Sequence, residues 1–161
     1  MSELATPPVK KRPEFRNINA FKDLTTYRLP LAGIVSILHR VSGAIMFLLL
    51  PFIIWMFDTS LSSEYSFARF KAAFNLGVPF TFNIYGFEDP WGFTLGGWFI
   101  KLVALALIWA YLHHLIAGLR HLYMDVNHAV TKEFGKTSAI VTLAASISLT
   151  LILGAKLFGL Y

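Results

Sequence analysis

Two adjacent histidines, His113 and His114, stand near the end of a long uncharged stretch of the sequence. An imidazole in such a stretch needs a hydrogen-bond or metal partner, because lipid supplies neither. If the stretch is a helix, His114, Gly118 and His121 lie on one face, whereas His113 points about 100° away. A glycine one turn from a histidine leaves room for a flat, bulky ligand. The spacing therefore suggests a ligand at this face, with a histidine bonded to a neighbouring helix as the alternative.

A second polar stretch interrupts an earlier apolar run. Ser36 and Arg40 are four residues apart and would share a helical face, with His39 beside them. An arginine inside a membrane helix costs roughly 2.5–3.5 kcal/mol even on a lenient insertion scale. Arg40 could extend its side chain to the membrane surface, or it could meet an anionic or carbonyl partner inside the bundle.

The elements that must position these residues are membrane spans. The chain is 56% hydrophobic and 14% charged, which is too apolar for an ordinary soluble domain. Its uncharged runs cover residues 29–57, broken only by His39 and Arg40, then 102–119 and 137–155. Runs of this length cross a bilayer as helices. We therefore predict an all-α membrane protein with three transmembrane helices that forms part of a heteromeric helical bundle.

Charge and proline predict the layout of the chain. Six of the 14 lysines and arginines precede the first span, which favours a cytoplasmic N-terminus, and Pro51 should kink the first helix. The predicted segments are a cytoplasmic tail with an interfacial segment (1–30), a first span (31–57), an external aromatic loop (58–97), a second span (98–122), a cytoplasmic loop (123–137) and a third span (138–158). This layout places the two polar stretches within roughly 8–14 Å of the same membrane face.

Composition also excludes several functions. The extramembrane segments are too short to fold as a catalytic domain, so soluble chemistry belongs to partner chains and no residue here is expected to be catalytic. The absence of cysteine excludes thiolate-held iron–sulfur clusters within this subunit. The net charge of +5 is concentrated before the first span, which argues for membrane topology rather than nucleic-acid binding.

Both polar stretches together resemble the cytochrome b subunit family of succinate dehydrogenase. The resemblance rests on two blocks, Ser36-x-x-His39-Arg40-x-Ser42-Gly43 and His114-x-x-x-Gly118-Leu119-Arg120-His121-Leu122-x-Met124-Asp125, and extends over the three-span layout. The sequence departs from the family pattern at Glu14, where an aliphatic residue is preferred, and at Asn127, where a small residue is common. Neither position is an expected site residue.

The resemblance implies specific roles. His114 would be an axial ligand of haem b and the metal ligand of this chain, with the second ligand supplied by another anchor subunit. Ser36 and Arg40 would line the site for ubiquinone, the substrate, and His39 and Arg40 would lie near the haem propionates. The implied partners are the second anchor subunit, an iron–sulfur subunit, a flavoprotein subunit and membrane lipids. The implied location is a bacterial inner membrane rather than a mitochondrial one.

Two other functions stay open from the residues. The chain could be an anchor of the same complex that keeps the quinone site without haem, which a haem absorption spectrum would distinguish. It could instead be a non-redox helical subunit, such as part of a transporter, with the histidines as a proton relay. The lack of acidic residues within the predicted spans argues against the relay.

Overall fold

The computed structural model describes residues 19, 22–23, 26, 29–80 and 93–161 of the chain. Three of its helices are long and apolar enough to cross a membrane: α2 (Leu31–Leu48), α5 (Gly97–Asn127) and α6 (Lys132–Leu157). At 1.5 Å per residue, the 31 residues of α5 and the 26 of α6 extend about 46 Å and 39 Å, beyond the roughly 30 Å of a hydrocarbon core. Most of the predicted 1–30 segment lies outside the described residues.

The first apolar run forms two helices rather than one. α2 begins directly after Pro30 and ends at Leu48, and α3 (Leu50–Leu61) begins two residues later. The intervening Leu49 has φ −92° and ψ 9°, outside the helical range, and Pro51 stands in the first turn of α3. A proline has no N–H to donate to the preceding turn, so the helix is interrupted just before it.

The segment between the first two spans, expected as a loop, contains regular structure. Helix α4 (Glu64–Asn75) begins with a capping box, in which Ser63 and Ser66 each accept a hydrogen bond from the other's backbone N–H. Strands β1 (Val78–Phe80) and β2 (Phe93–Leu95) then pair antiparallel. The spacing of Phe67, Phe70 and Phe74 predicts one aromatic face on a short surface helix, and all three residues lie on α4, where the ring centroids of Phe70 and Phe74 are 4.9 Å apart.

The spans pack through small side chains. α5 contacts both α2 and α6, and a shared core is formed by three residues with no exposed surface: Val35, Ala117 and Ala139. Small residues let helix backbones approach closely, which drives association where lipid removes the hydrophobic effect between helices.

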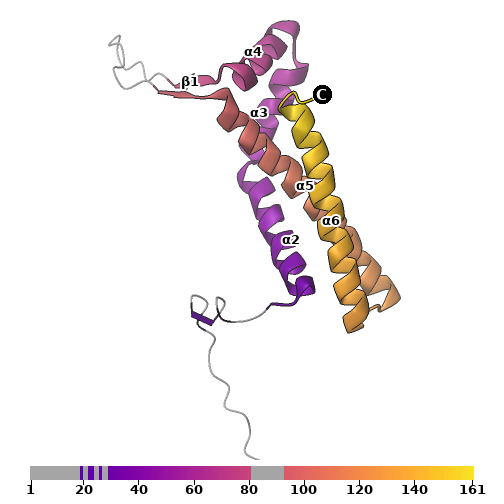
Figure 1. Cartoon of the computed structure of the whole chain (residues 1–161). Helices are drawn as coiled ribbons and strands as arrows, with labels where there is room; N and C mark the ends of the chain where they lie inside the picture. The colour runs from indigo at the N-terminus through magenta and orange to yellow at the C-terminus, as the bar shows by residue number, and fades with distance from the viewer. Residues whose placement is uncertain (1–18, 20–21, 24–25, 27–28, 81–92) are drawn as a thin grey trace, which may run out of the picture.

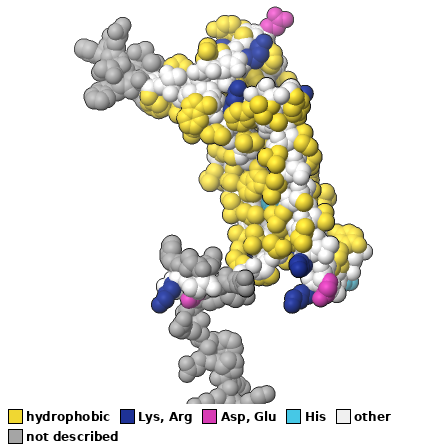
Figure 2. All heavy atoms as spheres, in the orientation of Figure 1, with side chains coloured by type: hydrophobic (Ala, Val, Ile, Leu, Met, Phe, Trp, Pro, Cys, Tyr) yellow, Lys and Arg dark blue, Asp and Glu magenta, His cyan; other side chains and the backbone are white. Residues whose placement is uncertain are grey.

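The outside of the bundle suits a membrane. Many large apolar side chains on the spans are exposed, among them Phe47 and Leu119, and Figure 2 shows hydrophobic side chains over the middle of the molecule with Lys and Arg towards both ends. The beginning of α2 and the C-terminus lie at opposite ends of the bundle (Figure 1), as three crossings require. The chain is thus a multi-pass, mostly helical membrane protein.

Candidate haem and quinone site

His114 projects from the middle of α5 onto α2. Its Nδ1 lies 3.0 Å from the His39 carbonyl oxygen and 3.3 Å from the Ser42 hydroxyl oxygen. Because a carbonyl can only accept a hydrogen bond, Nδ1 must carry the proton and Nε2 must carry the lone pair. The Ser42 hydroxyl donates to the same carbonyl at 2.8 Å, so its oxygen can accept from Nδ1. The ring is therefore fixed in one tautomer.

Three histidines from two helices meet at this point. The rings of His39 and His114 are stacked, with centroids 4.1 Å apart and planes 17° from parallel. The His121 ring also lies near His39, with its centroid 5.2 Å from that of His39. The structure thus brings together the histidines of both sequence blocks, as their predicted position near one membrane face requires.

Two glycines lie beside these rings, and one of them, Gly43, makes room for a ring. A methyl group on Gly43 would lie 3.0 Å from Cε1 and 3.3 Å from Nδ1 of His114, closer than a side chain normally packs. A methyl group on Gly118 would lie 3.5 Å from Nε2 of His39. The space beside Gly118, predicted to receive a flat ligand, therefore borders His39, and Gly43 is the glycine that accommodates His114. Gly43 was given no role from the sequence, although its position four residues after His39 was the available signal.

His113 points in a different direction and is part of the protein core. It is fully buried, its Nδ1 lies 3.2 Å from the Ser146 hydroxyl oxygen of α6, and it stacks on Trp109 at 5.5 Å. Its Nε2 is buried without a hydrogen-bond partner among the described residues, beside the Val35 backbone. Both histidines are bonded to a neighbouring helix, His113 to α6 and His114 to α2, but His113 is fully buried and His114 is partly exposed. His114 is therefore the candidate ligand.

Ser36 and Arg40 lie on α2 within a turn of His39. At 100° per residue, Arg40 is about 40° from Ser36 around the helix and Ser36 is about 60° from His39. Arg40 is exposed and Ser36 half-buried, and in the described part of the chain neither side chain makes a hydrogen bond or an ion pair. Serines in helices commonly donate a hydrogen bond to a backbone carbonyl of the preceding turn, as Ser42 does. Ser36 makes no such bond to the described residues, so its hydroxyl remains available to a ligand.

A further buried cation was not assigned from the sequence. Arg120 is 8% exposed, and its guanidinium donates to the Ser138 hydroxyl at 2.9 Å and to the Gly135 carbonyl at 3.3 Å. These bonds join the end of α5 to the beginning of α6. An arginine beside a short interhelical loop was the only signal in the sequence, and it does not distinguish this role from exposure to solvent.

The geometry fits a metal that takes one ligand from this chain. No group of three or more His, Cys, Asp or Glu side chains within the described ranges could hold a metal ion. Haem iron needs only one imidazole on each side, and Nε2 of His114 makes no hydrogen bond to the described residues. The stacked His39 covers a face of this imidazole, whereas a metal binds at the nitrogen in the plane of the ring.

The fold and the site define a class, the helical membrane subunits that carry histidines between apolar spans. The profile of the succinate dehydrogenase/fumarate reductase transmembrane subunit family matches residues 10–153, and the chain belongs to this family. It is a membrane-anchor subunit of succinate dehydrogenase, of the cytochrome b type.

Individual relatives agree over most of their length. The chain is 30% identical to the succinate dehydrogenase cytochrome b556 subunit of Coxiella burnetii over 132 residues, which cover 82% of this chain and 90% of the relative. It is 27% identical to the cytochrome b556 subunit of Paracoccus denitrificans, covering 80% of this chain and 83% of the relative. It is 32% identical to the cytochrome b560 subunit of Reclinomonas americana, covering 80% and 78%. The non-redox alternative is therefore set aside.

Proposed function

We propose that His114 is an axial ligand of haem b and that Ser36 and Arg40 contribute to a ubiquinone site beside it. The observation that carries the proposal is the fixed tautomer of His114. Its Nδ1–H is held by the His39 carbonyl at 3.0 Å, which leaves Nε2 with its lone pair for iron. A hydrogen bond from the non-ligating nitrogen is how proteins orient histidine ligands and raise their basicity. The subunits named cytochrome b556 among the relatives agree with a haem.

The second axial ligand would come from another anchor subunit. His39 stacks face to face on His114, with ring centroids 4.1 Å apart, which leaves no room for a metal between the two rings. His39 would therefore not supply the second ligand. His114 is only partly buried in this chain, which leaves its edge accessible to a haem shared with a neighbouring helix.

Ser36 and Arg40 would serve the quinone. Quinone reduction requires two electrons and two protons, and bound haem supplies a one-electron carrier near the site. The Ser36 hydroxyl can donate a hydrogen bond to a quinone carbonyl oxygen, and Arg40 provides a fixed positive charge that stabilises negative charge developing on that oxygen. Arg40 and His39 would also meet the haem propionates, whose negative charge would offset the cost of an arginine within the span.

The electrons would arrive at the end of the bundle where α2 begins. We propose that this end faces the cytoplasm of a bacterium and receives the iron–sulfur subunit, with the flavoprotein subunit beyond it. The basic residues before α2 favour that orientation in the inner membrane.

The haem assignment is tested with the purified complex. His114→Ala should lose or strongly alter the reduced-minus-oxidised haem spectrum, because it removes the nitrogen that ligates iron. His121→Ala is the matched control, since it removes a nearby imidazole that makes no hydrogen bond to the described residues, and it should retain a bis-histidine spectrum. The assignment is wrong if His121→Ala loses the haem and His114→Ala keeps it. A spectrum without haem in the wild type would favour the haem-free anchor.

The quinone assignment is tested through turnover. A hydrogen bond to a charged or strongly polarised oxygen is worth about 1.5–3 kcal/mol, so Ser36→Ala should lower succinate:ubiquinone activity by roughly one to two orders of magnitude. Reduction of an artificial dye that takes electrons before the membrane should stay unchanged in the same sample. Full quinone activity and inhibitor sensitivity in Ser36→Ala would show that the quinone site does not lie on this helix.

A further inference from the structure

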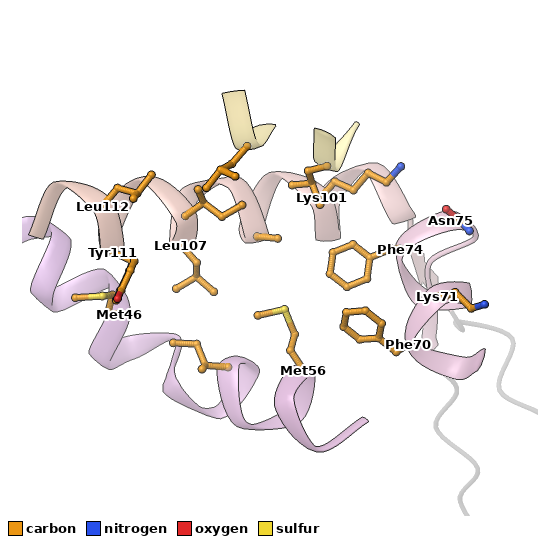
Figure 3. Close-up of a pocket in the computed structure, with 15 residues that line it drawn as sticks. Met46, Met56, Phe70, Lys71, Phe74, Asn75, Lys101, Leu107, Tyr111 and Leu112 are labelled. Carbon is orange, nitrogen blue, oxygen red and sulfur yellow. The ribbon is translucent and has the colours of Figure 1, made fainter. Parts of the chain in front are cut away.

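A second site is suggested by an apolar cavity of about 680 Å³ between α2, α3, α4, α5 and α6. Phe70 and Phe74 of α4, Met56 of α3 and Leu107 of α5 line it, and Figure 3 shows these side chains around an open space. The lining residues do not include Ser36, His39, Arg40 or His114, so the cavity is separate from the haem and quinone site.

The cavity has the length of one membrane leaflet. Its lining positions on α5 extend from Lys101 to Leu112, which is about 16 Å at 1.5 Å per residue. Half of a bilayer's hydrocarbon core is about 15 Å. The dimensions therefore suit hydrocarbon chain from a single leaflet.

The charges of the cavity lie at one end. Lys71 and Lys101 are the only charged residues in its lining, and in Figure 3 their nitrogen atoms lie at the α4 end, beyond Phe70 and Phe74. Each ammonium group lies near an aromatic ring, with Lys71 Nζ 4.9 Å from the centroid of Phe67 and Lys101 Nζ 5.9 Å from that of Phe158. Neither lysine forms an ion pair within the described part of the chain. Two cations without an anion thus mark the membrane-surface end of an apolar groove.

We propose that this cavity binds an anionic phospholipid from the leaflet on the α4 side. The acyl chain would occupy the space between Met56, Phe74 and Leu107, and the phosphate would accept hydrogen bonds from Lys71 and Lys101. Lysine stems lie along apolar surface while their charged ends reach the headgroup region, which is the arrangement seen at both positions. The proposal does not depend on the haem or quinone assignments.

The test measures lipid selectivity in the assembled complex. The complex is reconstituted in vesicles of equal phosphatidylglycerol and phosphatidylcholine, re-extracted in mild detergent, and weighed by native mass spectrometry to identify retained phospholipid. In Lys71→Gln/Lys101→Gln, the preference for phosphatidylglycerol over phosphatidylcholine should fall about 30-fold, which is about 2 kcal/mol at 1.4 kcal/mol per tenfold. This corresponds to the roughly 1 kcal/mol per basic residue expected near an anionic lipid.

A matched control makes the same change of charge elsewhere. Lys132→Gln/Lys156→Gln also removes two positive charges, both from exposed positions on α6 that do not line the cavity, and it should keep the wild-type preference. Met56→Trp, which places a larger ring in the cavity and narrows it, should reduce the retained phospholipid while both lysines remain. Dye reduction by succinate verifies assembly, and if the double variant does not assemble, each single lysine variant should show about a fivefold fall.

Several outcomes overturn the proposal. Equal retention of the two phospholipids by the wild type would show that the headgroup charge does not determine binding. An unchanged preference in the double or single lysine variants, or a loss as large in the α6 control, would place the lipid elsewhere. Retention of phospholipid by Met56→Trp at the wild-type level, or recovery of quinone instead of phospholipid, would show that the cavity has another occupant.

Discussion

Gly43→Ala tests how the packing of α2 positions His114, the proposed haem ligand. A methyl group at this position would lie 3.0 Å from Cε1 and 3.3 Å from Nδ1 of His114, so the imidazole must move by a few tenths of an ångström. The movement strains the hydrogen bond from Nδ1 to the His39 carbonyl, which is 3.0 Å long. The substitution should therefore disturb the ligand directly.

Two effects of opposite sign determine the size of the change. Alanine is better than glycine inside a helix by about 1 kcal/mol, whereas an extra methyl group in a tightly packed place costs about 1–3 kcal/mol. The net change in the stability of the complex should therefore lie between about zero and a loss of about 2 kcal/mol. The cost falls on His114, so we expect haem affinity to weaken by about 1–2 kcal/mol, or about 5- to 30-fold at 1.4 kcal/mol per tenfold.

Gly33→Ala is the matched control for this measurement. It makes the same substitution on the same helix, but its methyl group would meet Pro30 at an ordinary 3.7 Å and no histidine. Haem content, the reduced-minus-oxidised spectrum and the haem potential are measured for both variants, with dye reduction to verify assembly. The reasoning is refuted if Gly43→Ala and Gly33→Ala keep the same haem content, spectrum and potential.

Two further predictions concern the spans themselves. Ser146→Ala removes the hydroxyl beside buried His113, and leaving that ring nitrogen unpaired should destabilise the complex by about 1–3 kcal/mol with the haem spectrum intact. Thermal unfolding measures the loss against Ser148→Ala, which changes an exposed serine two residues further along α6 and should have little effect. Equal melting temperatures for the two variants would contradict the pairing. Reporter fusions at Ser63 and Tyr161 should both lie on the side opposite the cytoplasm, because an odd number of spans separates the cytoplasmic tail from each position. A cytoplasmic signal at Tyr161 would mean that the chain crosses the membrane one time fewer than proposed.

The three spans could be predicted because hydropathy and length act over many residues at once. A long uncharged run has few alternatives to a membrane helix, since every backbone group must be bonded within lipid. The end of α2 was harder to predict. Pro51 indicated a kink, but whether the helix bends or stops depends on the next turn, and here Leu49 leaves helical geometry altogether.

The structure of the segment after the first span could not be predicted in the same way. Helix α4 depends on a capping box between Ser63 and Ser66, a signal carried by two hydroxyls that are equally common in loops. Strands β1 and β2 have three residues each, too few to show an alternating pattern in the sequence. No local sequence pattern specifies that these two strands pair with each other.

The candidate site shows the same limit at the level of single residues. Helical spacing placed His114 and His121 on one face and directed His113 away from it, and the structure agrees. Spacing within one helix cannot show which neighbouring helix fills the space beside a glycine. For that reason the contact of Gly118 with His39 and the tight contact of Gly43 with His114 were not predicted, whereas a ligand beside Gly118 stays a prediction.

The adjacent histidines show what distinguishes a ligand from a packing residue when type and position in the chain are nearly the same. His113 is fully buried, and its ring is enclosed by Trp109 and Ser146, so nothing large can reach its nitrogen atoms. His114 is fixed on one side only, where Nδ1 meets a carbonyl, and it stays partly exposed at its other edge. A haem ligand must be both oriented and accessible, and a rotation of about 100° between consecutive residues gives one histidine both properties and the other only the first.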